Sequence, residues 1–265
     1  TVYPGEVHAL LGENGAGKST LMNVIYGIYK PDRGEVFLSG KPVRIHSPKD
    51  ALRHGIGMVH QHFMLVDVFS AIENMGLIGD VKTFSITNRR KIEDTLEQLK
   101  QKYGIDVDLH SPVGQLSIGM QQKVEILKLL YTGADVLIFD EPTAVLLPQE
   151  CDGLFEIIAN LTSEGKGVIF ISHKLDEVLK ISRRITVLTK GRVTGQIDTK
   201  DADKSTIVRM MVGEEVTPPE FSKIRRDRKD MVPVLCARDL KAEDDRKVRT
   251  LNGVSLSVYP GEVLG

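Results

Sequence analysis

A glycine-rich segment near the start of the chain has the residue types and spacing of a phosphate-binding loop. It fits the pattern G-x-x-x-x-G-K-[ST] and lies between an apolar run and a helical pattern. Glycines let backbone N–H groups curl around phosphate oxygens, and the helix that follows adds its positive N-terminal end. Lys18 offers a compact charge to the β- and γ-phosphates, and the Ser19 hydroxyl suits Mg²⁺. The residues predicted to bind the nucleotide are Gly12, Glu13, Asn14, Gly15, Ala16, Gly17, Lys18, Ser19 and Thr20.

Two adjacent carboxylates are candidates for the same chemistry. Asp140 and Glu141 follow the apolar run 136–139, which is typical of a buried strand. Asp140 would hold Mg²⁺ directly or through water, and Glu141 would orient and deprotonate an attacking water, a role worth about 10²–10⁴-fold in rate. By itself, a strand-terminal Asp-Glu pair is more often part of a turn. The phosphate-binding pattern in the same chain reverses that preference.

The elements that must position these residues alternate between strands and helices. The predicted strands are 7–11, 56–60, 136–139 and 167–172, the predicted helices include 18–26, 92–103 and 148–164, and 36–38 with 43–45 form a predicted hairpin. In the first helix, Leu21, Val24 and Ile25 share one apolar face. Such alternation favours a parallel sheet, in which ligands bind beyond the carboxyl ends of the strands.

The two ends of the chain carry a repeat. The residues Val-Tyr-Pro-Gly-Glu-Val at 2–7 recur at 258–263, which predicts two tandem copies of one domain in a parent protein about twice as long. The second copy would begin at 233 and be truncated, and the first would lack its N-terminal strands. Residues 214–232 are predicted to be a charged, solvated linker. The alternative, a nucleic-acid patch, is disfavoured by its interleaved aspartates and lack of aromatic residues.

The composition restricts the classes of partner. Across 265 residues the formal net charge is -1, which gives no global field for capturing nucleic acid, so no nucleic-acid partner is expected. No apolar run approaches the roughly 20 residues that span a bilayer, so any membrane role is expected to be peripheral. Cys151 and Cys236 lack metal-site spacing and are expected to be free thiols.

Further motifs resemble those of ABC-type nucleotide-binding domains. The segment 116–122, Leu-Ser-Ile-Gly-Met-Gln-Gln, looks like the family signature, usually Leu-Ser-Gly-Gly-Gln. Gln61 after a strand resembles the Q-loop, and His173 in Ile-Ser-His resembles the H-loop. With the phosphate loop and the Asp-Glu pair, they follow the family order, which P-loop kinases and GTPases do not show. The resemblance therefore argues against a non-ABC P-loop enzyme.

The resemblance implies an α/β fold of the P-loop NTPase type. It has a RecA-like parallel sheet core, an antiparallel β subdomain and an inserted helical subdomain. The first ABC ATPase domain would be 1–213, with its core at 1–62 and 117–213 and the helical subdomain at about 63–116. The linker 214–232 and the start of a second ABC domain at 233–265 would follow.

The resemblance also assigns roles to single residues. The catalytic residues would be Glu141, His173 and Gln61, the Mg²⁺ ligands Ser19, Gln61 and Asp140, and the signature residues Ser117, Ile118, Gly119, Met120 and Gln121. The signature would close over ATP bound by the opposing domain, so that ATP joins two domains and hydrolysis releases them. Ile118 and Met120 replace the usual Gly and Gln, and Leu147 stands where the family usually has an aspartate.

The tandem arrangement is similar to the fused ATPase subunits of bacterial simple-sugar and nucleoside importers. Within that group, the segment 58–65 more closely resembles the nucleoside branch. This likeness implies an ATPase that energises uptake at the cytoplasmic face of the membrane. Its partners would be transmembrane permease subunits, the second ABC domain of the same parent chain and, indirectly, an extracytoplasmic solute-binding protein. The alternative is a soluble tandem ABC ATPase that acts on ribosomes or nucleic acid. Such proteins usually carry long insertions or basic arms, and neither is visible in this sequence.

Overall fold

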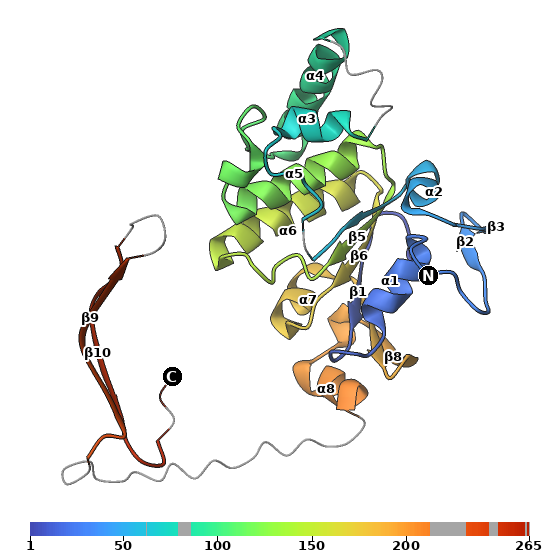
Figure 1. The fold of residues 1–265 in the computed structure, drawn as a ribbon. Coiled ribbons are helices and arrows are strands. Elements are labelled where there is room, and N and C mark those ends of the chain that lie inside the picture. Colours follow the sequence, from blue (N-terminus) through green and yellow to red (C-terminus); the bar gives the residue numbers. More distant parts are fainter. Residues whose placement is uncertain (62, 79–85, 213–231, 244–248, 263, 265) are drawn as a thin grey trace. The chain divides into compact units, whose positions relative to one another are not determined.

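The computed structural model describes residues 1–61, 63–78, 86–212, 232–243, 249–262 and 264. The chain divides into two compact units, Thr1–Val216 and Thr217–Gly265 (Figure 1), and each is described by itself. Of the predicted charged linker, 214–231 lies outside the described residues.

A six-stranded sheet forms the centre of the first unit. Its strands are β1 Val7–Leu11, β4 Ile56–Val59, β5 Val136–Asp140, β6 Gly167–Ile171, β7 Arg184–Thr189 and β8 Arg192–Asp198. Their order is β4-β5-β6-β1-β7-β8, in which β8 runs antiparallel to β7 and the other neighbours are parallel. Every residue of β1, β4 and β6 is buried, because helices cover both faces.

The helices form a layer on each face of this sheet. They are α1 Lys18–Ile25, α2 Pro48–Arg53, α5 Ile118–Tyr131, α6 Pro148–Ser163, α7 Leu175–Ile181 and α8 Lys204–Val212. Residues of α1 and α2 join one core cluster and residues of α5 and α6 the other. Successive strand residues divide between the clusters, as Ile138 and Phe139 show, because side chains alternate across a sheet. The predicted parallel α/β core is confirmed.

Helices α3 Ala71–Gly76 and α4 Ile86–Tyr103 form the predicted helical insertion between β4 and β5. Helix α3 begins with a capping box, in which Ser70 and Glu73 each bind the other's backbone N–H group. Helix α4 buries Ile92, Leu96 and Tyr103, as its periodicity predicts. The insertion packs on α5, which carries the signature-like segment at its start.

Two details of the predicted elements are wrong. The hairpin pairs β2 Val36–Leu38 with β3 Lys41–Val43, so its second strand begins two residues before the predicted 43–45. Ser39 and Gly40 both have positive φ (50° and 76°), and this tight turn lets pairing resume at once. In α1, Leu21 is 40% exposed and Met22 is buried instead. Met22 lies one turn after the buried Lys18, so the two share the inward face.

The second unit contains a single described hairpin, in which β9 Leu235–Glu243 pairs antiparallel with β10 Arg249–Val258. The repeated segment after β10 has the same local structure as its counterpart in the first unit. Gly261 has φ 72° and Gly5 has φ 73°. The Tyr259 N–H group donates to Glu262 Oε2 at 3.0 Å, as the Tyr3 N–H group donates to Glu6 Oε1 at 2.8 Å. The sequence repeat is therefore also a repeat of backbone conformation.

Among the helices that the structure describes, none has the length and hydropathy of a membrane-spanning segment. Cys151 is buried and Cys236 is exposed, and both are free thiols.

Candidate functional site

The strand order of the central sheet brings four predicted site segments together at one edge, the one formed by the carboxyl-terminal ends of neighbouring strands. The glycine-rich loop follows β1, His173 follows β6, Asp140 ends β5 with Glu141 directly after it, and Gln61 follows β4. These four strands are neighbours and run parallel, so their carboxyl ends lie together. Residues separated by more than a hundred positions in sequence therefore face the same region.

Lys18 is held inside the glycine-rich loop by backbone oxygens. Only 6% of the residue is exposed, and Nζ donates hydrogen bonds to Gly12 O at 2.7 Å and Glu13 O at 3.0 Å. The Ala16 N–H group also donates to Glu13 O, at 3.1 Å. The ammonium group is thus placed within the curve of the loop, where a bound phosphate would meet it.

The first turn of α1 is suited to an anion. Its N-cap is Gly17, with φ 100°, and no side chain accepts from the first amides. By contrast, Ser47, Ser70 and Ser117 cap α2, α3 and α5 with their hydroxyl groups. The uncapped N–H groups of α1 are therefore available to phosphate oxygens.

Gly12 is required by close packing against the sheet. A Cβ there would lie 2.4 Å from Leu188 O and 2.9 Å from the Cβ of Ala16. The turn after β7 also supports the loop, because the Gly191 N–H group donates to Ala16 O at 2.9 Å. At the outer side of the loop, the residues exposed to solvent are Glu13, Asn14, Gly15, Ser19 and Thr20.

Asp140 and Ser19 form the candidate Mg²⁺ site. Asp140 is only 7% exposed. Burial, followed by the nearby Glu141 carboxylate, raises the pKa of Asp140, while the side chains of Ser19, His60 and Lys18 act in the opposite direction. A cation beside this carboxylate would relieve that penalty on the charged form.

The donor set fits Mg²⁺. Among the described residues, no group of three or more His, Cys, Asp and Glu side chains could hold a metal by itself. Mg²⁺ in nucleotide sites commonly takes one or two protein carboxylates together with phosphate oxygens and water. Asp140 and Ser19 supply the protein's part of such a set.

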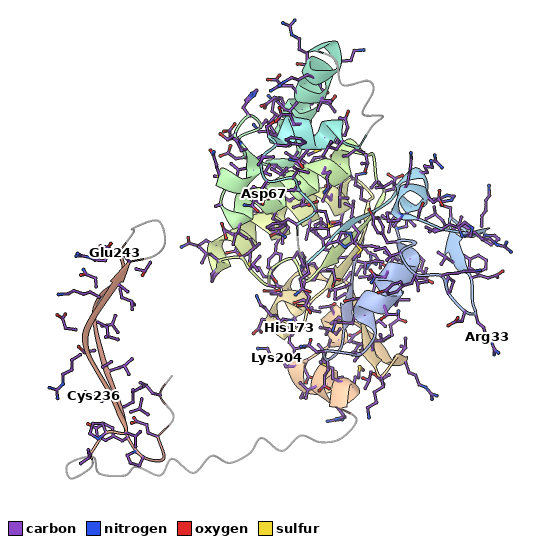
Figure 2. The ribbon with its side chains drawn as sticks, in the orientation of Figure 1. Arg33, Asp67, His173, Lys204, Cys236 and Glu243 are labelled. Carbon is purple, nitrogen blue, oxygen red and sulfur yellow. The ribbon has the colours of Figure 1, made fainter. Side chains whose placement is uncertain are left out.

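Glu141 and His173 form a close pair across neighbouring strands. Glu141 Oε2 lies 3.3 Å from His173 Nδ1, and the Glu141 N–H group donates to Ile171 O at 3.0 Å. The His173 side chain is 53% exposed, whereas that of Glu141 is 16% exposed (Figure 2 labels His173). Glu141 has φ 48°, a left-handed conformation that costs a non-glycine residue about 1–2 kcal/mol. Backbone strain of this kind often concentrates at functional sites.

A supporting network that the sequence analysis missed joins the segments after β5 and β6. Glu177 Oε2 accepts from Thr143 Oγ1 at 2.5 Å and from Ser172 Oγ at 3.1 Å. Lys174 Nζ donates to Thr143 O at 3.0 Å and contacts Glu177 Oε1 at 3.0 Å. These bonds fix the backbone that presents Glu141 and His173. Glu177 carries no motif in the sequence that could have identified it.

Gln61 is exposed at the bend after β4, and the described residues include no hydrogen-bond partner for its side chain. The preceding residue is more firmly held, since the His60 ring packs edge-on against Tyr26 with centroids 5.6 Å apart. Burial lowers the pKa of His60, although Glu125 and Asp140 oppose that effect. The metal and catalytic roles of Gln61 stay predictions.

The signature-like segment belongs to a different surface. Ser117 caps α5 by accepting from the Met120 N–H group at 3.3 Å, and Gln121 Nε2 donates to Leu116 O at 3.1 Å. Ser117, Ile118 and Met120 are exposed, and Gly119 is buried against Glu150 of α6. A cavity of about 260 Å³ between α5 and α6 is lined partly by this segment and by no residue of the glycine-rich loop.

Comparison with known proteins decides the family. The sequence model described as "ABC transporter" matches residues 1–144, which is more than half of the chain. The chain belongs to the ABC transporter family. The resemblance inferred from its motifs is confirmed.

Curated relatives of this ABC family member include import proteins. It is 46% identical over 264 residues to the guanosine import ATP-binding protein NupO of Bacillus subtilis, covering 100% of this chain and 51% of that one. It is 43% identical over 293 residues to the glucose import ATP-binding protein TsgD13 of Haloferax volcanii, covering 100% and 53%. The chain thus spans about half the length of these relatives.

Solved ABC cassettes share the fold. The ADP conformation of MJ1267, an ATP-binding cassette of an ABC transporter, matches with a TM-score of 0.66 and 26% identity, covering 80% of this chain and 89% of that chain. A nucleotide-free ATP-binding cassette matches with a TM-score of 0.68 and 27% identity, covering 80% and 90%. The expected P-loop NTPase fold class is confirmed.

The raised pKa of Asp140 predicts a pH-dependent effect on stability. A carboxyl group whose pKa is higher in the folded chain favours folding while protonated, and that contribution is lost as pH rises through the folded-state pKa. Asp140→Asn removes the loss, so the ligand-free variant should be more stable than wild type at neutral pH. The difference should vanish below the ordinary aspartate pKa. Denaturant titrations across pH measure it.

The exposed Asp94→Asn of α4 is the matched control and should show no such trend. A less stable Asp140→Asn variant at neutral pH would contradict the electrostatic account of this site.

Proposed function

We propose that this chain binds Mg²⁺-ATP at the carboxyl edge of its sheet and hydrolyses it. The convergence of the glycine-rich loop with Glu141 and His173 at that edge carries the proposal. Membership of the ABC transporter family and the likeness to solved ATP-binding cassettes support it.

The binding step uses the loop and α1. The N–H groups of residues 12–20 would surround the phosphates, and Lys18 would exchange its bonds to Gly12 O and Glu13 O for phosphate oxygens. Ser19, Asp140 and Gln61 would hold Mg²⁺. When bound, that ion neutralises charge on the β- and γ-phosphate oxygens.

The hydrolytic step uses the pair across β5 and β6. The Glu141 carboxylate would orient the attacking water and accept its proton. His173 lies close enough to Glu141 to share in holding that water and would contact the γ-phosphate. Gln61 would sense the γ-phosphate from the end of β4. The network of Thr143, Ser172 and Glu177 would keep these groups in register.

The signature residues Ser117, Ile118, Gly119, Met120 and Gln121 are proposed to act on ATP bound by an opposing ABC domain. Their exposed position at the N-terminus of α5 suits contact with a second domain. We propose domain bounds of 1–213 and, after the linker 214–232, a second ABC domain that starts at 233. The repeated turn at Gly5 and Gly261 and the double length of the relatives support a tandem parent chain.

The biological role proposed is that of the energising subunit of an importer for a nucleoside or simple sugar. Guanosine import by NupO and glucose import by TsgD13 support this solute class. The protein would act peripherally on the cytoplasmic face of the membrane with transmembrane permease subunits. An extracytoplasmic solute-binding protein would contribute indirectly.

The segment after Gln61 is the proposed contact with the permease. Met64, Val66, Val68 and Phe69 are exposed, with Val68 the most exposed of them at 76%. Leu77 and Ile78, which follow α3, are also exposed. Exposed apolar side chains gathered beside a candidate active site are typical of a partner-binding surface.

Lys18→Ala should abolish ATP binding at this site, because it removes the only side chain of the loop that is placed to neutralise phosphate charge, so the full-length protein should bind fewer ATP molecules. Isothermal titration calorimetry on the full-length protein measures this. The exposed Lys49→Ala of α2 is the control and should bind as wild type does. An unchanged number of ATP-binding sites in Lys18→Ala would refute the assignment of the loop.

Glu141→Gln should bind ATP but lower turnover by about 10²–10⁴-fold at this site, since the amide cannot accept the proton from water. Steady-state ATPase assays beside equilibrium ATP binding separate the two effects. Glu156→Gln, on the exposed face of α6, should hydrolyse at the wild-type rate. Undiminished hydrolysis in Glu141→Gln would remove this residue from the mechanism.

The full-length protein should co-purify with hydrophobic subunits from detergent-solubilised membranes. Val68→Asp should weaken that association, whereas Val193→Asp, which is 62% exposed on β8, should leave it intact. Sedimentation with ribosomes, in place of membrane subunits, would favour the soluble tandem ATPase.

A further inference from the structure

Helix α5 carries a buried carboxylate that the proposed mechanism does not use. The Glu125 side chain is only 3% exposed, and Lys128, one turn later, is 18% exposed. Their side chains form an ion pair with Glu125 Oε2 and Lys128 Nζ 2.5 Å apart. Burying a carboxylate costs free energy unless hydrogen bonds and ion pairs satisfy both of its oxygens. The other contacts of Glu125 therefore indicate its role.

Both residues bind the backbone of the same distant residue. Glu125 Oε1 accepts from the Met64 N–H group at 2.5 Å, and Lys128 Nζ donates to Met64 O at 2.9 Å. The peptide groups on both sides of Met64 are therefore fixed by one ion pair. We refer to this arrangement of Glu125, Lys128 and Met64 as the α5 clamp.

A second polar side chain holds the residue that lies two positions further along. Asn74 of α3 accepts from the Val66 N–H group at 2.8 Å through Oδ1 and donates to Val66 O at 3.2 Å through Nδ2. Asn74 is itself buried. The stretch after β4 is thus attached at Met64 to α5 and at Val66 to α3.

The positions of the clamped residues give this arrangement a functional meaning. Met64 lies three residues after Gln61, and Glu125 lies on the helix that Ser117 begins. An α-helix is a stiff element that rises about 1.5 Å per residue. The α5 clamp therefore ties the backbone at Met64, three residues after Gln61, to the helix that carries the signature.

We propose that Glu125 and Lys128 are positioning residues that hold Gln61 and the signature helix together as one mechanical unit. This inference rests on the proposed role of Gln61 in hydrolysis. When ATP bound by the opposing domain attracts the signature residues, α5 moves with them. The α5 clamp then transmits this displacement to the segment that contains Gln61. An apolar pair of similar volume could fill the same space but could not bind both peptide groups of Met64.

The test uses the full-length protein and Lys128→Met, which removes both contacts of Nζ and keeps much of the side-chain volume. Turnover at this site, taken as the part of the ATPase rate that Glu141→Gln removes, should fall about tenfold, as expected for one charge-assisted bond. Equilibrium binding of ATP without Mg²⁺ should stay within about twofold, because the glycine-rich loop is untouched. Lys128→Arg should recover most of the turnover.

Lys100→Met is the matched control. Lys100 forms the same kind of pair with Glu97, three residues earlier on α4, and its side chain is also 18% exposed. In the described part of the chain, Lys100 makes no hydrogen bond with Met64, so the variant should retain wild-type turnover. A loss equal to that of Lys128→Met would mean that an ion pair of this kind on α4 matters as much as the one on α5, and would overturn the proposal.

Hydrogen exchange at 63–66 shows directly whether the clamp has opened. Exchange in this stretch should be faster in Lys128→Met and Glu125→Gln than in wild type and unchanged in Lys100→Met. Unchanged exchange would overturn the clamp, and faster exchange with wild-type turnover would overturn its positioning role. If Lys128→Met fails to fold, the milder Glu125→Gln, which keeps an acceptor for the Met64 N–H group, gives the same comparison.

Gln61→Ala distinguishes a failure of the clamp proposal from a failure of the proposed role of Gln61. If Gln61→Ala lowers turnover and the clamp variants do not, only the clamp is wrong. If Gln61→Ala itself has wild-type turnover, the proposed role of Gln61 fails, whatever the clamp variants do.

Discussion

The parallel pairing of β4, β5, β6 and β1 is the constraint on which the candidate site depends. Each buried strand must satisfy its backbone N–H and C=O groups through its neighbours, so the order of the sheet fixes which strand ends meet. That order places the glycine-rich loop, Asp140, Glu141, His173 and Gln61 at one edge. Helix layers on both faces hold the sheet rigidly, and the site residues are therefore attached to a rigid support.

The charges at this edge are arranged for a ligand that carries charge of both signs. Lys18 is buried with carbonyl oxygens around its ammonium group, and Asp140 is buried beside a second carboxylate. Each charged form is costly to bury, and a complex of triphosphate with a divalent cation would offset both costs at once. The left-handed backbone of Glu141 also favours a functional site here, because a non-glycine residue keeps that conformation only where surrounding bonds impose it. Here, those bonds include the one to Ile171 and the network around Glu177.

Helix α5 connects parts of the molecule that would otherwise be independent. Its N-terminus presents Ser117 to solvent, its middle packs in the core, and its Glu125 and Lys128 hold Met64. Asn74 attaches the same stretch to α3, so the segment after β4 is joined to α5 at Met64 and to the helical insertion at Val66. The exposed apolar residues around Val68 continue from this stretch. The surface proposed for a membrane partner thus lies only a few residues along the chain from Gln61.

The sequence by itself determined what depends on local chain chemistry. Glycines at 12, 15 and 17 and short apolar runs specify the loop and the strands, because each preference acts within a few residues. The repeat of Val-Tyr-Pro-Gly-Glu-Val at the two ends was also visible in the sequence. The sequence did not determine which face of α1 is buried, since the burial of Met22 in place of Leu21 depends on packing partners far along the chain. The Glu141–His173 contact, the bonds of Glu177 and the α5 clamp were decided only by the tertiary structure. The long-range contacts among them, Glu141 with His173, Thr143 with Glu177 and Lys128 with Met64, join residues 32, 34 and 64 positions apart, and no local preference fixes where such side chains meet.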